Sequence, residues 1–118
     1  MSMSQRPLLI VEDSPEDYET AVRAFRQAGL ENPICHCADG EEALDFLYRR
    51  GTYSERVFLP QPGLILLDLN LPGTDGRDVL QEIKQDERLK AIPVVVLTTS
   101  SDERDIERCY RAGVNSYL

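Results

Sequence analysis

The sequence lacks a long apolar run and has few cysteines. A bilayer-spanning helix needs roughly 20 apolar residues, and no stretch approaches that length. No N-terminal segment joins a basic region to an apolar run, as a secretory signal would. The three cysteines, Cys35, Cys37 and Cys109, are too few and irregular for a secreted disulfide scaffold. We therefore expect a cytoplasmic protein that does not enter a membrane.

Basic residues are also scarce. Lysine and arginine number 13 against 21 acidic residues, which gives a formal net charge of -8. Nucleic acids and anionic membranes both bind basic patches, so neither is an expected partner. A length of 118 residues with 42% hydrophobic residues predicts one globular domain. The acidic surplus either keeps the surface solvated or gathers at one site.

Short apolar runs at residues 8–11, 64–67 and 94–97 have no polar alternation. Such runs are typical of parallel strands that are buried on both faces. Residues 34–37 and 115–118 are weaker strand candidates. The segment 51–63 is long for a connection, and either a binding surface or a tolerated insertion would explain it.

Helical patterns separate these runs. Ser14 and Pro15 are typical of a helix start, and Ala21, Val22, Phe25 and Ala28 follow on one predicted inner face. Further helices are predicted at about 40–50, 75–87 and 102–112. The alternation of strand and helix predicts a doubly wound α/β fold with a five-stranded parallel sheet.

Polar residues follow the apolar runs at one predicted edge of this sheet. Glu12 and Asp13 come after the first run, Asp68 ends the second and Thr98 ends the third. Ligands of open α/β sheets bind beyond the carboxyl ends of the strands. Close carboxylates repel each other unless one is protonated or a cation binds. An all-oxygen site of this kind suits Mg²⁺, and a carboxylate beside it can accept a phosphoryl group.

These motifs resemble response-regulator receiver domains over essentially the whole chain. The resemblance is carried by residues 11–14, 66–76, 93–98, 112–113 and Tyr117, in order and at the family's intervals. It implies a flavodoxin-like fold with strand order 2-1-3-4-5. It also implies a histidine-to-aspartate phosphorelay protein that assists only its own phosphorylation and dephosphorylation and is not otherwise an enzyme.

The resemblance implies a role for each matching residue. Asp68 is the expected phospho-acceptor. Glu12, Asp13, Asp68 and the backbone carbonyl of Asn70 are the expected Mg²⁺ ligands. The family most often has two aspartates where this chain has a glutamate first.

Two further residues match the positions that change conformation in the family when the aspartate is phosphorylated, and we call them the switch residues. Thr98 corresponds to the hydroxyl that moves toward the phosphoryl group, and Tyr117 corresponds to the aromatic residue that changes rotamer with it. Residues 12–17, 51–63 and 67–73 further resemble the stand-alone regulators that partner bacterial phytochrome histidine kinases. A kinase of that type is the expected phosphoryl donor.

The family also has a lysine three residues after the switch aromatic, followed by a fifth helix. Both would fall after Leu118, so we expect residues 1–118 to be a receiver domain truncated before its final helix. Apolar surface left without that helix normally finds a partner. We therefore expect a homodimer or other self-association.

Other functions remain as alternatives. The missing lysine motivates a phosphorylation-independent, receiver-like interaction module, although the intact acidic site argues against it. An aspartate-nucleophile phosphatase would need an acid at position 70, where Asn70 cannot shuttle protons. A nucleotide-binding flavodoxin-like domain would need a glycine-rich phosphate loop, which the sequence lacks.

The sequence Cys35-His36-Cys37 suggests a metal site at first sight. On a strand, however, the two cysteines face one side of the sheet and His36 faces the other. No second Cys/His pair completes a tetrahedral set. We therefore interpret these residues as ordinary packing and not as ligands of one ion.

Overall fold

The computed structural model describes residues 6–55, 60–97 and 116–117. The elements, in chain order, are β1 (Leu8–Val11), α1 (Pro15–Gln27), β2 (Ile34–Cys37), α2 (Gly40–Tyr48), the 3-10 helix η2 (Gly51–Tyr53), β3 (Leu64–Asp68), α3 (Gly76–Gln85), β4 (Val94–Leu97) and β5 (Ser116–Tyr117). The five strands form one sheet in the order β2-β1-β3-β4-β5, and every neighbouring pair is parallel. This confirms the predicted fold and strand order. The helix predicted at 102–112 lies outside the described residues.

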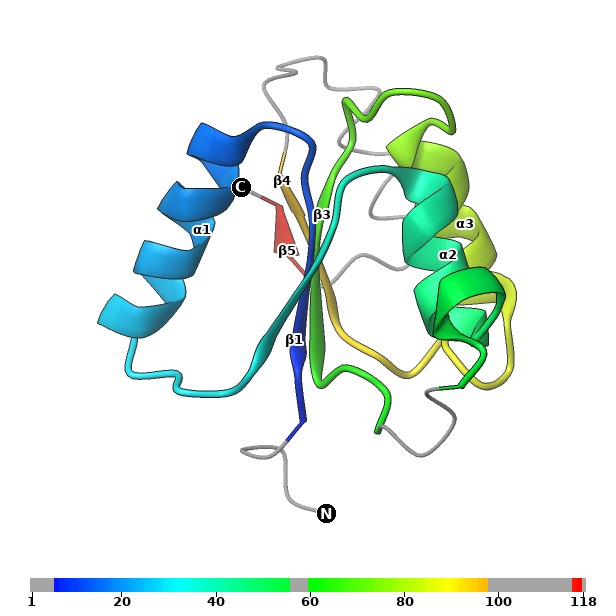
Figure 1. The fold of residues 1–118 in the computed structure, drawn as a ribbon, viewed down its shortest axis with the longest axis horizontal. Coiled ribbons are helices and arrows are strands. Elements are labelled where there is room, and N and C mark those ends of the chain that lie inside the picture. Colours follow the sequence, from blue (N-terminus) through cyan, green and yellow to red (C-terminus); the bar gives the residue numbers. More distant parts are fainter. Residues whose placement is uncertain (1–5, 56–59, 98–115, 118) are drawn as a thin grey trace.

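Helices cover both faces of the sheet (Figure 1): α1 lies on one face, while α2 and α3 lie side by side on the other. Successive strand residues point to opposite faces. Leu9 and Val11 therefore pack toward α2 and α3, and Ile10 packs toward α1. A sheet covered in this way needs strands that are apolar on both sides, which explains the uninterrupted apolar runs.

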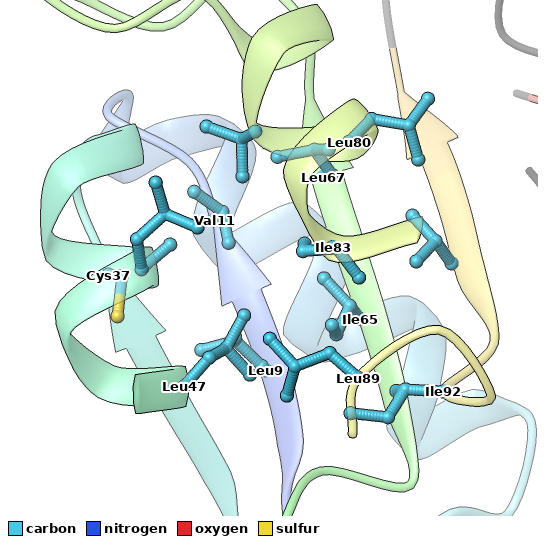
Figure 2. Close-up of a cluster of buried hydrophobic side chains, with 14 of the residues drawn as sticks. Leu9, Val11, Cys37, Leu47, Ile65, Leu67, Leu80, Ile83, Leu89 and Ile92 are labelled. Atoms are coloured by element: carbon cyan, nitrogen blue, oxygen red, sulfur yellow. The ribbon is translucent and has the colours of Figure 1, made fainter. Parts of the chain in front are cut away.

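The larger core cluster fills the space between the sheet and the pair α2 and α3 (Figure 2). Ile65 and Leu67 of β3 meet Leu80 and Ile83 of α3 there, all at 1% exposure or less. Burying one such aliphatic side chain stabilises the fold by roughly 1.5–3 kcal/mol. This cluster fixes β1 and β3 as neighbours, and their carboxyl ends hold the candidate site.

Side-chain caps make the helices begin close to the strand ends. The Ser14 hydroxyl accepts a hydrogen bond from the Asp17 amide at the start of α1. Asp39 caps α2 and Asp75 caps α3 in the same way. The inner face predicted for α1 is wrong at one position, because Ala28 is the exposed C-cap and the helix ends at Gln27.

The segment after α2 folds back onto that helix. The Tyr53 hydroxyl donates to Glu42 Oε1 at 2.9 Å, and the Tyr53 ring meets the Phe46 ring edge-on at 5.2 Å. Further along, the Gln61 amide donates to the Leu47 carbonyl at 2.9 Å. The described parts of the long 51–63 segment therefore form a packed extension of α2. Within the described ranges, no helix combines the length and apolarity that a bilayer span requires.

Candidate functional site

Three carboxylates meet at the carboxyl edge of the sheet. Val11 pairs with Leu67 in the parallel register of β1 and β3, so the residues after Val11 lie beside Asp68. One oxygen each from Glu12, Asp13 and Asp68 lies within 4.8 Å of the others. The sequence predicted this convergence, because parallel strands end at the same edge.

Glu12 is the buried member of the group. Its side chain is only 3% exposed, and its Oε1 accepts a hydrogen bond from the Ser14 amide at 3.0 Å. Burial raises the pKa of Glu12 to about 7, the Ser14 hydrogen bond opposes that rise, and the charge of Asp68 adds to it. The carboxylate therefore lies in surroundings that disfavour its negative charge, and a nearby cation would relieve this.

Asp68 is the last residue of β3 and is half-buried. The Asn70 amide donates to Asp68 Oδ1 at 2.9 Å, which holds the carboxylate against the turn that follows the strand. The Leu69 amide donates to the Leu97 carbonyl at 3.1 Å and continues the pairing with β4. The position of Asp68 is thus set by both the strand and the turn.

A cavity of about 340 Å³ opens over these groups. Its lining residues are Glu12, Asp13, Ser14, Asp17, Asp68, Asn70 and Leu97. Asp17 is an addition to the predicted set, and it lies in the first turn of α1. Its place in the helix, one turn after the Ser14 cap, is the signal that would have found it.

The residues present fit a divalent metal ion. The available donors are carboxylate oxygens from the segment that follows β1 and from the end of β3, held at one point. This is the ligand chemistry of hard cations such as Mg²⁺ and Mn²⁺. The described lining residues of the cavity include no basic side chain that could offset their charge. The acidic group is therefore suited to bind a divalent cation.

The structure describes the main chain of one of the two predicted switch residues and does not describe the other. Thr98 lies outside the described residues. Tyr117 is placed as a residue of β5, where its main chain pairs with Val96 of β4. The switch assignments therefore stay predictions.

A family model for the response regulator receiver domain matches residues 8–118. The chain belongs to this family. The receiver domain is 46% identical over 111 residues to the response regulator Rcp1 of Synechocystis sp., covering 94% of this chain and 74% of Rcp1. It thus belongs to the signalling proteins of two-component phosphorelays, which are not conventional enzymes.

Solved structures agree with this family assignment. The Mn²⁺-bound form of Rcp1 has a TM-score of 0.87 to the receiver domain at 45% identity, covering 96% of this chain and 79% of that one. The phosphorylated cyanobacterial phytochrome response regulator RcpA has a TM-score of 0.87 at 42% identity, covering 97% of this chain and 79% of that one.

Proposed function

We propose that Asp68 accepts a phosphoryl group from a phosphohistidine of a partner kinase. An Asp68 carboxylate oxygen attacks phosphorus, the phosphorus–nitrogen bond breaks, and the electron pair returns to the imidazole of the donor. The product is an aspartyl phosphate. Attack by water on its phosphorus later breaks the bond to Asp68, which restores the carboxylate and releases inorganic phosphate. The meeting of Glu12, Asp13 and Asp68 within 4.8 Å is the observation that carries this proposal.

Glu12, Asp13, Asp68 and the backbone carbonyl of Asn70 would hold Mg²⁺ in this site. When bound, the ion supplies positive charge that offsets the repulsion between the carboxylates and the phosphoryl oxygens. Asn70 positions the acceptor, because its amide holds Oδ1 of Asp68. The family relative Rcp1 has a Mn²⁺-bound form and the relative RcpA has a phosphorylated form, which supports both parts of the proposal.

Incubation with acetyl phosphate and Mg²⁺, followed by intact-mass analysis, tests this function. We expect a phosphoryl adduct on the wild type and none on the Asp68→Asn variant. Asp75→Asn is the matched control, since Asp75 is an exposed acid that caps α3 and asparagine also caps helices well. Equal adduct on wild type and Asp68→Asn would reject Asp68 as the acceptor.

The phosphohistidine donor belongs, we propose, to a bacterial phytochrome histidine kinase. The support is the 42% identity to a phytochrome response regulator along 97% of this chain. Phosphotransfer from such a kinase should be faster than from an unrelated histidine kinase, and equal rates would contradict the assignment.

Self-association also stays a prediction. Sedimentation of the full chain tests it.

A phosphorylation-independent interaction module is the second function that the sequence left open. It predicts partner binding that is the same for wild type and Asp68→Asn, with or without acetyl phosphate. The buried Glu12 beside Asp68 argues against it, because a purely structural domain gains nothing from ionisable groups held at close range.

A further inference from the structure

A histidine from the edge strand contacts the main chain of the acidic site. His36 Nε2 lies 2.7 Å from the carbonyl oxygen of Glu12. A carbonyl oxygen can only accept, so Nε2 carries the hydrogen and donates it. The contact reaches beyond the last paired residues of these strands, Val11 and Cys37.

The imidazole ring is held in place from the other side by α1. The rings of Tyr18 and His36 stack with their centroids 3.9 Å apart and an interplanar angle of 15°. Tyr18 itself packs against the smaller core cluster that includes Ile10, Ala21 and Leu66. His36 is exposed, but its ring is oriented by the stack on Tyr18, and Tyr18 is held in place by its packing against the core.

Glu12 is therefore held by three hydrogen bonds. Its amide donates to the Cys37 carbonyl at 3.0 Å, its carbonyl accepts from His36, and its side chain accepts from the Ser14 amide. The carbonyl belongs to the planar peptide group that joins Glu12 to Asp13. A hydrogen bond to that oxygen fixes the orientation of the peptide plane. It thereby also fixes the direction in which the main chain continues from Glu12 to Asp13, after the end of β1.

We propose that His36 is a positioning residue for the divalent-cation site. Its Nε2–H holds the peptide plane between Glu12 and Asp13, so that both carboxylates stay directed toward Asp68. This inference rests on the proposed function of the acidic site. His36 contacts the Glu12 main chain, so it acts through Glu12, as partners that orient metal ligands do.

Two amide substitutions separate hydrogen bonding from stacking. In His36→Gln the side-chain amide nitrogen can occupy nearly the place of Nε2, whereas the shorter side chain of His36→Asn cannot reach it. Both variants lose the ring that stacks on Tyr18. A role confined to stacking therefore predicts the same Mg²⁺ affinity for the two variants.

The measurement is the dissociation constant for Mg²⁺, titrated by calorimetry at a single fixed pH, together with the denaturant midpoint without Mg²⁺. We expect His36→Asn to weaken Mg²⁺ binding by about tenfold and His36→Gln to stay close to wild type. Both variants should have a lower denaturant midpoint than the wild type, because both lose the stack on Tyr18. Tyr18→Phe, which keeps an aromatic ring, should bind Mg²⁺ as the wild type does.

Equal Mg²⁺ affinity in His36→Asn, His36→Gln and the wild type would overturn the positioning role. So would a loss of affinity that is the same in both variants, since that would reflect the lost stack. Adduct formation on wild-type Asp68 is measured in parallel. A wild type that binds Mg²⁺ and forms the adduct while His36→Asn is unaffected rejects the His36 proposal alone. A wild type that binds no Mg²⁺ rejects both proposals.

Discussion

Gly76 at the start of α3 packs directly against the main chain of Asp68. A Cβ atom on Gly76 would overlap the Asp68 carbonyl oxygen and lie 2.6 Å from the Cα of Leu69. The Gly76 amide also donates to the Leu69 carbonyl at 3.3 Å. The first turn of α3 therefore helps to set the position of the proposed acceptor.

Gly76→Ala should disturb both folding and phosphorylation. The clash is with backbone atoms, which cannot rotate away, so we expect a loss of about 1–3 kcal/mol in the free energy of unfolding. Adduct formation with acetyl phosphate should slow as well, because the end of β3 must shift. Denaturant titration and timed intact-mass analysis measure the two effects.

Gly29→Ala is the control for that substitution. Gly29 has φ +86°, and a Cβ there would meet nothing within 4 Å. The cost is therefore conformational, about 1 kcal/mol, and lies far from the site. Gly29→Ala should form adduct at the wild-type rate. If the two alanine variants slowed adduct formation equally, the specific link between Gly76 and Asp68 would be refuted.

Glu12→Gln should stabilise the metal-free protein at high pH. The pKa of Glu12 is raised from 4.5 to about 7, chiefly by burial. Between these values the folded protein binds more protons than the unfolded chain, so its stability falls as pH rises. The full cost of ionising Glu12 is present above pH 7, and it is absent below pH 4.5.

Denaturant titrations in a chelator test this difference. At about pH 8 the glutamine variant should be more stable than the wild type by on the order of 2 kcal/mol, and at about pH 4 the two should be nearly equal. Excess Mg²⁺ should then stabilise the wild type and leave the variant almost unchanged. A stability difference that is constant with pH would show that Glu12 is not held in unfavourable surroundings.

The sequence alone was sufficient to predict the fold and to predict that the three acidic residues lie close together. Uninterrupted apolar runs identify buried parallel strands, and parallel strands bring Glu12, Asp13 and Asp68 to one edge. The end of α2 was less predictable. It ends at Tyr48 because Arg49 adopts φ 56°, a conformation that arginine does not signal in the sequence.

The role inferred for His36 could not be predicted either. Strand periodicity correctly places it on the face opposite the buried Cys37. Its contact with the Glu12 carbonyl depends on the spacing of β1 and β2 and on the place of Tyr18 over the sheet. Such side-chain contacts across elements leave no local pattern, so the sequence alone indicates only ordinary packing for His36.

Tyr53→Phe should loosen the segment that follows α2. The lost hydrogen bond to Glu42 contributes about 1 kcal/mol to the free energy of unfolding, and the ring contact with Phe46 is retained. In the control Glu42→Gln the amide oxygen still accepts from Tyr53, and the bond that is lost is the one from the Ala38 amide to Glu42 Oε2 before α2. Exchange in residues 51–55 of this variant should therefore stay at the wild-type level. Hydrogen exchange should rise in residues 51–55 of Tyr53→Phe before it rises in β1. Unchanged exchange in that segment would mean that the hydrogen bond does not hold it.

Cys37 should be protected from alkylation in the folded protein. The side chain is fully buried, and burial raises the pKa of its thiol to about 12, so the reactive thiolate is scarce. Cys35 on the same strand is only half-buried and serves as the internal reference. Peptide mapping after timed iodoacetamide labelling should show much slower modification at Cys37 than at Cys35.

Because Cys37 belongs to the main core cluster, its labelling requires that the core open. When reclosing is faster than alkylation, the labelling rate follows the equilibrium population of the open form. Gly76→Ala should therefore accelerate labelling of Cys37 by the factor that its loss of unfolding free energy implies, roughly tenfold for each 1.4 kcal/mol. Labelling of Cys35 should change less. If Cys37 were labelled at the same rate in Gly76→Ala as in the wild type, despite the loss of stability, the reagent would reach the thiol through a local opening of β2 and not through opening of the core.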